Sequence, residues 1–318
     1  MQVRPSNFQT IFQKMKTLSR TNLFYVITAA ISITAAGVFY FSGGKYDSTA
    51  GLILATFYMF VPTIAVLLVD KLIYKEAIKT RLLISFKLNK WFVVAWLVAP
   101  VLAVASMGVS LLFPDVAFSP GMEGMFDRYE EMLTAEQMQE MRNSLDNMPF
   151  HPFWLTLIQG LVAGLTINAI AGFGEELGWR GFLLRQFENK RFFKAALVIG
   201  FVWGIWHAPL ILMGHNYPTY PVFGVFMMTV WCILLSPLFL YITIKAKSVI
   251  AAAIMHGTLN ATAGLSLMTL EGGNELTVGA TGLAGFIALI FITAGFYFYD
   301  KYISREEIML KAISLNDV

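Results

Sequence analysis

Residues 221–244 read PVFGVFMMTVWCILLSPLFLYITI, a run without a single charged side chain. A helix needs about 20 consecutive apolar residues to cross the hydrocarbon core of a bilayer. The chain as a whole is similarly apolar, with 57% hydrophobic residues, 14% charged residues and a mean hydropathy of +0.64. Soluble domains carry about 25% charged residues. The sequence therefore predicts an all-α, polytopic membrane protein.

Seven further runs of this kind give about eight predicted transmembrane helices. The first run is longer than the core of a signal peptide and lacks a clear cleavage site, so we expect it to be retained. The predicted spans cover residues 22–43, 49–70, 91–113, 153–174, 195–213, 221–244, 248–270 and 279–299.

Lys and Arg residues concentrate in alternate loops. The loops that separate the cation-rich segments hold one Lys in 44–48, two Arg in 114–152, and no Lys or Arg in 214–220 or 271–278. Cytoplasmic loops are enriched in these residues. Both termini are therefore predicted to be cytoplasmic. The cation-rich segments are 1–20, 71–90, 180–194, 245–247 and 301–311.

The predicted domain organisation has three parts. Residues 1–20 place apolar residues at helical spacing between basic ones, which is typical of an amphipathic helix on the inner membrane surface; an unstructured basic tail is the alternative. Residues 21–300 form the eight-helix membrane domain. Residues 301–318 form a cytoplasmic C-terminal tail.

The predicted outer loop 114–152 is acidic. Thr134 and Gln137 form a capping-box pattern, and Met138, Met141 and Leu145 then share one helical face. We expect one or two short helices that rest on the outer surface. Such a loop could serve as a lid for a substrate or partner, or simply shield the helix ends from solvent.

Polar residues inside the apolar runs concentrate in spans four, five and seven. Ionisable groups within membrane spans are costly and mark functional sites by default. The sequence therefore predicts a polar cavity between these three spans, within a catalytic core of residues 172–265. The residues are Asn168, Glu175, Glu176, Arg180, His207, His256 and Asn260.

Helical spacing separates the two adjacent carboxylates. Glu176 and Arg180 stand at i and i+4 and can pair, whereas Glu175 is rotated by about 100° and points elsewhere. His256 and Asn260 share one face by the same spacing. Each of these features alone also fits a structural role, as an ion-pair clamp or as an interhelical hydrogen bond.

The surroundings of the other polar residues carry weaker signals. Pro209 removes a helical hydrogen bond just after His207, so a bend there could make room for a cavity. Asn168 is expected to form an interhelical hydrogen bond. His151 and His215 lie near the outer boundary and are interpreted as interfacial.

Three short motifs resemble those of the CPBP family, intramembrane proteases related to the CAAX prenyl endopeptidases. EELGWR (175–180) matches the EExxxR motif, WGIWH (203–207) stands where the family has FxxxH, and HGTLN (256–260) matches HxxxN/D. Their order in successive hydrophobic helices also matches. Trp203 stands in place of the usual Phe and could narrow the cavity.

The resemblance implies a glutamate-dependent intramembrane endopeptidase that needs no metal or other cofactor. It assigns Glu175 as the general base that activates water, with His207 helping to bind and polarise that water. His256 and Asn260 would donate hydrogen bonds to the oxyanion. Glu176 and Arg180, with Trp203 as a further supporting residue, would hold the architecture of the site.

The predicted span boundaries leave a mismatch in depth. Glu175 falls near the cytoplasmic end of span four, which predicts access from the cytoplasm. His207 lies about 20 Å along a straight helix from Lys194, and therefore deeper than Glu175. Either span five begins later than residue 195, or the Glu175 end of span four dips into the membrane. We expect the later start, with residues 182–194 lying partly along the inner surface.

Two other functions remain open from the sequence. A Glu and two His can hold a catalytic zinc ion, although the chain has no HExxH motif. A non-catalytic transporter or an immunity or regulatory scaffold is the other alternative, but no internal repeat favours a transporter. Cys232 is the single cysteine, which excludes an intrachain disulfide.

The expected partners follow from the membrane assignment. They are the lipid bilayer and a membrane-associated peptide or protein substrate, and no sequence pattern indicates a nucleic-acid partner or an oligomeric state. The expected location is a bacterial plasma membrane.

Overall fold

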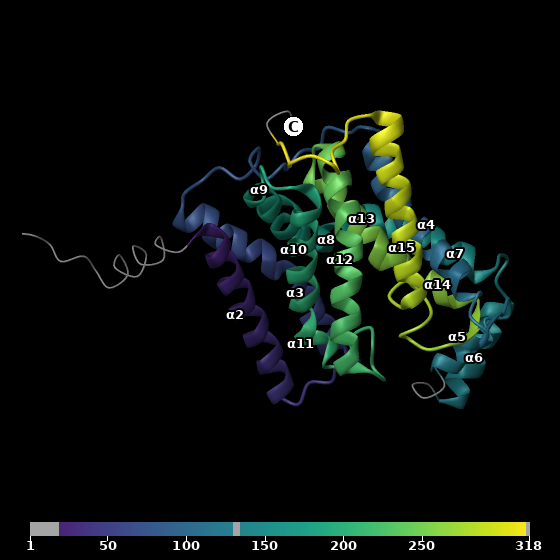
Figure 1. Ribbon diagram of the computed structural model, residues 1–318. Helices are drawn as coiled ribbons and strands as arrows, with labels where there is room; N and C mark the ends of the chain where they lie inside the picture. Colours follow the sequence, from purple (N-terminus) through teal and green to yellow (C-terminus); the bar gives the residue numbers. More distant parts are fainter. Residues whose placement is uncertain (1–18, 130–133, 316–318) are drawn as a thin grey trace, which may run out of the picture.

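The computed structural model describes residues 19–129 and 134–315, and almost all of its regular structure is helical (Figure 1). Within these described residues, seven helices are long and apolar enough to cross a membrane, and a bent helix pair brings the number to eight. The predicted all-α membrane fold with about eight spans is thus confirmed. The predicted amphipathic helix covers residues 1–20, of which residues 1–18 lie outside the described residues.

The spans agree with the predicted runs to within a few residues at most boundaries. Three of them contain a π-helical segment, named η, in their last part. The elements that span the molecule are α2 (Arg20–Phe41), α3 (Thr49–Val66) with η1 (Leu67–Ile73), α4 (Lys90–Ser110), α7 (Pro152–Leu165), α8 (Ile167–Glu176) with η2 (Leu177–Leu183) and α9 (Leu184–Gln186), α10 (Phe192–Trp206) with α11 (Ala208–Ile211), α12 (Pro221–Ala246), α13 (Val249–Thr262) with α14 (Leu265–Met268), and α15 (Leu283–Phe298) with η3 (Tyr299–Ser304).

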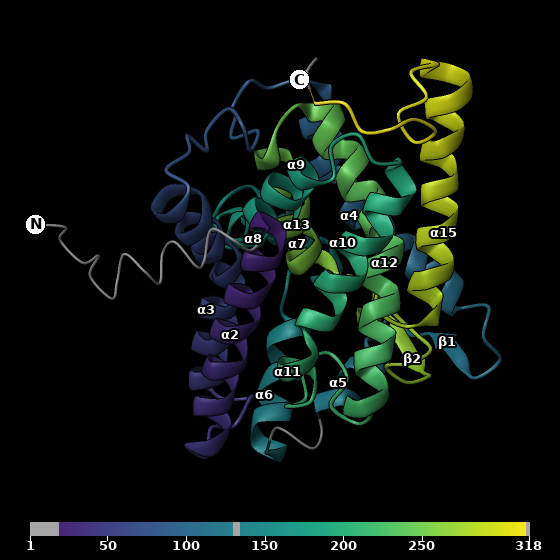
Figure 2. The ribbon, with the colours of Figure 1, turned by 60° about the vertical axis from the view of Figure 1, so that its left-hand side comes forward.

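Successive spans run in alternate directions, so both described ends of the chain lie at the same end of the bundle (Figure 2). The loops 74–89 and 187–191, which are rich in Lys and Arg, lie there too, and we name this the cation-rich end. The loops 42–48 and 212–220 lie at the opposite end.

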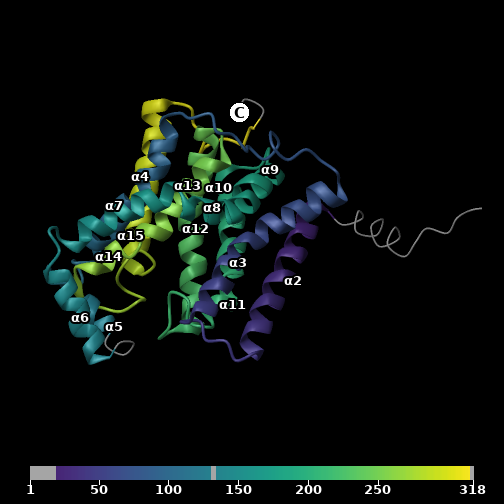
Figure 3. The same ribbon diagram turned by 180° about the vertical axis from the view of Figure 1, so that it is seen from behind.

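Span four differs from its prediction as a single run over 153–174. α7 and the helix that continues to Gln186 meet at a bend of 53° around Thr166, and α7 runs toward the centre of the bundle, where α8 begins (Figure 3). Glu175 therefore lies in the middle of a helix rather than at its end. The prediction missed the bend because no Pro lies there, and a single Gly inside an apolar run, here Gly164, does not by itself mark a bend.

The expected late start of span five is wrong, because α10 begins at Phe192 after a short loop. The chain runs about 16 Å from Glu175 to Gln186, and also about 16 Å from Phe192 to Trp203, at 1.5 Å per residue. The extra turns after Glu175 thus remove the mismatch in depth, and Glu175 faces Trp203.

Glycines let the helices of the site approach one another closely. A Cβ on Gly172 of α8 would lie 2.7 Å from the Ala253 carbonyl oxygen of α13, and a Cβ on Gly257 would lie 2.5 Å from the Asn168 backbone. Membrane helices associate through such small residues, because lipid supplies no hydrophobic driving force. The resulting contact brings the Glu175 helix and the His256 helix together.

The loop between α4 and α7 contains the two short helices that were predicted, α5 (Glu123–Tyr129) and α6 (Ala135–Asp146). The capping box of Thr134 and Gln137 is present. A strand pair was not predicted: β1 (Val116–Phe118) runs antiparallel to β2 (Leu270–Gly272). Because three-residue strands carry little period-two pattern, the sequence offered no signal for this pair.

The predicted tail 301–318 begins inside a helix, since η3 extends α15 to Ser304. The residues that follow fold back onto the bundle and pair with the loop before α10. The Asn189 amide donates to the Ile313 carbonyl at 2.8 Å, and the Ile313 amide donates to the Lys190 carbonyl at 2.9 Å. Met309, Ile313 and Leu315 are buried.

Candidate active site

A cavity of about 310 Å³ lies where α3, α8, α10, α12 and α13 meet. Its lining includes all four residues predicted to be catalytic: Glu175, His207, His256 and Asn260. The structure therefore brings these side chains together from three different spans. Apolar and aromatic side chains form most of the remaining wall, among them Tyr58, Trp203, Trp206 and Trp231.

Glu176, Arg180 and His256 form a buried chain of contacts beside the cavity. Arg180 Nη1 donates to both oxygens of Glu176, at 3.0 and 3.1 Å, and both side chains are fully buried. His256 Nδ1 lies 2.7 Å from Glu176 Oε1. A carboxylate paired with Arg only accepts hydrogen bonds, so the proton of this bond belongs to His256 Nδ1. The pair thereby fixes the orientation of the imidazole.

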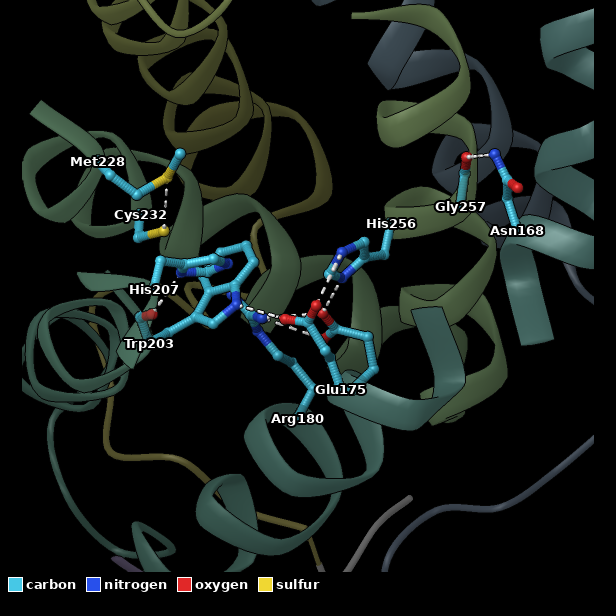
Figure 4. A network of polar contacts seen from close by, with 10 residues as sticks. Asn168, Glu175, Arg180, Trp203, His207, Met228, Cys232, His256 and Gly257 are labelled. Atoms are coloured by element: carbon cyan, nitrogen blue, oxygen red, sulfur yellow. Dashed lines mark hydrogen bonds and ion pairs between the residues drawn. The ribbon is translucent and has the colours of Figure 1, made fainter. Parts of the chain in front are cut away.

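Glu175 approaches the other nitrogen of the same imidazole. Its Oε1 lies 3.7 Å from His256 Nε2, and its Oε2 accepts a hydrogen bond from Trp203 Nε1 at 2.8 Å (Figure 4). Among the ion pairs of the described residues, Arg180 meets Glu176 and not Glu175. As predicted, Glu176 and not Glu175 pairs with Arg180. The prediction that Glu175 points away from Glu176 is wrong at His256, because α8 and α13 pack so closely that both carboxylates approach the same imidazole ring.

Trp203 has a larger part than its expected role as a bulky Phe substitute. Its indole N–H donates to Glu175, which a phenyl ring cannot do. The guanidinium carbon of Arg180 lies over the Trp203 ring, 4.1 Å from its centroid. The same carbon lies over the Phe239 ring, 4.2 Å from that centroid. Cation–π contacts are stronger in desolvated sites, so the two rings help to hold the buried charge of Arg180.

His207 stands at the predicted break between α10 and α11, before Pro209. Its Nδ1 lies 2.7 Å from the Trp203 carbonyl oxygen. Since a carbonyl only accepts, Nδ1 carries the proton, and in the neutral ring Nε2 is then an acceptor. His207 thus presents a proton-accepting nitrogen at the cavity.

Asn168 and Asn260 lie where their predicted roles require. Asn168 Nδ2 donates to the Gly257 carbonyl at 3.4 Å, which is the expected bond between α8 and α13. Asn260 lies one turn after His256 and lines the cavity with an exposed side chain. Its amide can therefore donate to a molecule in the cavity.

His215 lines the same cavity, which the interpretation as an interfacial residue missed. Its Nδ1 lies 2.9 Å from the Tyr46 hydroxyl, and burial lowers the pKa of His215 to about 4. Burial also raises the pKa of Tyr46 to about 12. No spacing motif links these residues, because they come from two loops far apart in the sequence.

The cavity extends toward the end of the bundle opposite to the cation-rich end. Tyr46, His215, Asn216 and Thr281 line it there, and Asn216 is exposed. The prediction of access from the cation-rich side rested on Glu175 lying at the end of its helix. Because the helix continues to Gln186, that premise fails, and the lining loops lie at the other end.

A metal site does not emerge from the geometry. Within residues 19–129 and 134–315, no group of three His, Cys, Asp or Glu side chains is arranged to hold a metal ion. His151, the remaining histidine, caps α7 and lies 2.8 Å from the Pro120 carbonyl oxygen, away from the cavity.

Comparisons with known proteins identify the segment that carries the site. Residues 150–262 match the model of a family described as type II CAAX prenyl endopeptidase Rce1-like. The chain is also similar to "CAAX prenyl protease 2" of Methanococcus maripaludis, with 28% identity over 154 residues. The alignment covers 45% of this chain. It covers 52% of the curated relative, so this chain spans about half of the length of that protein. Residues 150–262, which carry the three motifs and the candidate site on apolar helices, are therefore similar to the CAAX-type endopeptidases of the CPBP family.

Proposed function

We propose that this chain is an intramembrane endopeptidase in which Glu175 activates the water that hydrolyses a peptide bond. The observation that carries this proposal is the environment of Glu175. Its carboxylate lines a cavity and meets Trp203 and His256, while the nearby Arg180 is taken up by Glu176. A carboxylate that no Arg or Lys neutralises in a poorly solvated site suits a general base.

The proposed reaction consumes one water molecule and one peptide bond. Glu175 accepts one proton of the water as its oxygen attacks the carbonyl carbon, and His207 Nε2 accepts a hydrogen bond from the same water. The C–N bond then breaks, and Glu175 returns its proton to the leaving amine. The second product is the carboxylic acid of the new C-terminus, which releases its proton to water and becomes the carboxylate.

The oxyanion of the tetrahedral intermediate needs hydrogen-bond donors. The Asn260 amide is a donor in every protonation state. His256 is a donor at Nε2 when its ring carries a second proton, and its Nδ1–H bond to Glu176 keeps the ring aligned. Removing one such donor costs about 10²–10³ in rate.

The substrate we propose is a membrane-associated peptide or protein. The similar protein and the matching family are named as CAAX prenyl proteases, and a CAAX prenyl substrate is one member of that class. With the cation-rich end in the cytoplasm of a bacterium, as the loop charges predict, the cavity would take up water from the outer side.

The test compares peptides released from membranes that contain the wild type, Glu175→Gln or Glu136→Gln. Glu175→Gln keeps the shape of the side chain and removes the base, and Glu136→Gln is a matched change at an exposed site on α6. We expect fragments that vanish in Glu175→Gln and persist in Glu136→Gln. Identical fragments in all three membranes would refute the proposed role of Glu175.

Two alternatives have their own outcomes. A zinc peptidase would lose activity on strong chelation and regain it with Zn²⁺, whereas the glutamate mechanism predicts activity that resists chelation. A non-catalytic scaffold would keep its cellular phenotype in Glu175→Gln. Either of these results would replace the proposal.

A further inference from the structure

A second cavity lies beside the mouth of the catalytic cavity, between the loops 42–48 and 212–220 (Figure 2). Its volume is about 510 Å³, and we call it the outer groove. Tyr46 lines both the outer groove and the catalytic cavity, and its hydroxyl lies 2.9 Å from His215 Nδ1 of the other loop. Tyr46 therefore forms a wall that the two spaces share.

The catalytic cavity alone is small for a peptide substrate. Its volume of about 310 Å³ lies at the lower end of the range of about 300–1,000 Å³ that is typical of small-molecule sites. A peptide bond inside a chain has residues on both sides, so the bound chain must leave this cavity. The polar mouth with Tyr46, His215 and the exposed Asn216 offers a way out, and it leads directly to the outer groove.

The lining of the outer groove suits an extended peptide. Leu212 and Pro221 supply apolar surface, and Lys45 and Asp47 add exposed charges of opposite sign. A Cβ on Gly214 would have no neighbour closer than 3.8 Å, so bare backbone borders the groove there. Extended peptides are recognised in this way, by backbone groups together with pockets for individual side chains.

The outer groove lies at a membrane interface. Tyr40 from the last turn of α2 and Pro221 from the start of α12 line it, and Tyr is typical of the boundary between membrane and water. Inside the hydrocarbon core a peptide must keep its backbone hydrogen bonds within its own helix. An extended segment is therefore favourable in the groove, where water and protein can satisfy its backbone.

The spacing along one span relates the outer groove to the reacting bond. Leu212 in the groove lies five residues after His207 in the catalytic cavity. Five residues of helix rise about 8 Å. Extended chain covers about 3.3–3.6 Å per residue, so this distance corresponds to about two residues of substrate.

We propose that the outer groove binds an extended juxtamembrane segment of the substrate, on the side of the membrane opposite to the cation-rich end. This inference rests on the proposed endopeptidase activity. The bound segment lies about two residues from the scissile bond, and the chain continues past Tyr46 and His215 to Glu175. Cleavage therefore falls near the end of a membrane span of the substrate and not at its middle.

The first measurement maps the fragments released in membranes that contain the full chain. Fragments that are absent with Glu175→Gln define the cleavage sites. Leu212→Trp places an indole in the outer groove, and Leu52→Trp is the matched control, since Leu52 is 67% exposed on α3 and lines neither cavity. We expect Leu212→Trp to lower the yield of these fragments about tenfold or more, and Leu52→Trp to leave it unchanged.

Synthetic peptides then separate binding in the groove from a change in the fold. A long peptide carries about four residues on each side of a mapped cleavage site, and two shortened peptides each lack the outer residues of one side. With the wild type and Leu52→Trp, one of the truncations should lower kcat/KM about tenfold. With Leu212→Trp the same truncation should have little effect, because the groove is already filled. A merely structural defect would instead lower kcat/KM for all three peptides alike.

Thermal melts check the fold of each variant, and Pro218→Trp, at another exposed position of the lining, replaces Leu212→Trp if that variant does not fold. Wild-type membranes without Glu175-dependent fragments would refute the proposed function and this inference together. Four results would overturn the inference alone: full fragment yield in Leu212→Trp, equal truncation effects in Leu212→Trp and the wild type, no truncation effect in the wild type, or cuts in the middle of spans.

Discussion

Glu175 and Glu176 are consecutive residues that reach opposite nitrogens of the His256 ring. Glu176 also pairs with Arg180. The ion pair therefore fixes the Glu176 carboxylate, and the carboxylate in turn fixes the orientation of the imidazole. The contact of Glu175 with Trp203 completes the arrangement. Glu176 therefore has the structural role and Glu175 the proposed chemical one, although both side chains contact the same ring.

Removing Arg180 should damage the fold before it affects chemistry. Arg180→Met leaves the carboxylate of Glu176 buried without its cation, and breaking a buried pair in this way costs about 3–5 kcal/mol. We expect a lower yield and a lower melting temperature in detergent. The double variant Glu176→Gln/Arg180→Met should recover part of the loss, because no unpaired charge remains. A melting temperature of Arg180→Met equal to that of the wild type would contradict the role assigned to the pair.

His215 makes a prediction about pH. Its pKa of about 4 in the fold lies below the ordinary value of about 6.5. Between these pH values the unfolded chain binds more protons, so the stability contributed at neutral pH is lost as pH falls from 6.5 toward 4, by at most about 3 kcal/mol. Melting temperatures measured across this range should fall more steeply for the wild type than for His215→Gln. Parallel curves would show that His215 does not titrate this way.

At the scale of helices, close contacts at glycine hold the site together. Gly257 allows α13 to touch α8, and Gly200 and Gly204 allow α10 to touch α12, where a Cβ on Gly204 would lie 2.5 Å from the Thr229 Cα. These contacts fix the spacing of Glu175, His207 and His256, because each residue lies on one of the packed helices.

The contact at Gly257 can be tested with a matched glycine. Gly257→Ala should destabilise the protein by about 1–3 kcal/mol, because the methyl group overlaps the backbone of Asn168. Gly37→Ala, in a helix position with no atom within 4 Å, should be neutral or stabilising by up to about 1 kcal/mol. Melting temperatures of the two variants check this. Equal shifts would mean that the interhelical contact carries no energy.

The sequence predicts where the helices lie along the chain better than it predicts the angles between them. Apolar runs locate the spans and helical spacing pairs Glu176 with Arg180, because both signals are local. The bend at Thr166 was missed, since hydropathy reports composition and not direction. The contacts of Glu175 with Trp203 and of His215 with Tyr46 join distant segments, and no local pattern encodes them.

The whole molecule has one end rich in Lys and Arg and a catalytic cavity that extends toward the other. If loop charge sets the orientation, the cavity faces away from the cytoplasm. The sequence predicted cytoplasmic access, because it placed Glu175 at the end of a span. In the structure the cavity extends toward the opposite end, so the water for hydrolysis would come from outside the cytoplasm.

Cysteine labelling in intact cells can decide the orientation. In a Cys232→Ser background, Asp47→Cys reports on the opposite end and Lys79→Cys on the cation-rich end; both positions are exposed. A membrane-impermeant maleimide should label Asp47→Cys and label Lys79→Cys only after lysis. The reverse pattern would place the cavity toward the cytoplasm.

The backbone pairing of residues 311–313 with residues 189–192 has a practical consequence for anyone who modifies the chain. This pairing secures the start of α10, the helix that carries Trp203 and His207 to the cavity. A stop codon after Ser304 would remove it and leave the first turn of α10 without its partner. A reporter fused there would interfere in the same way, so fusions belong after Leu315.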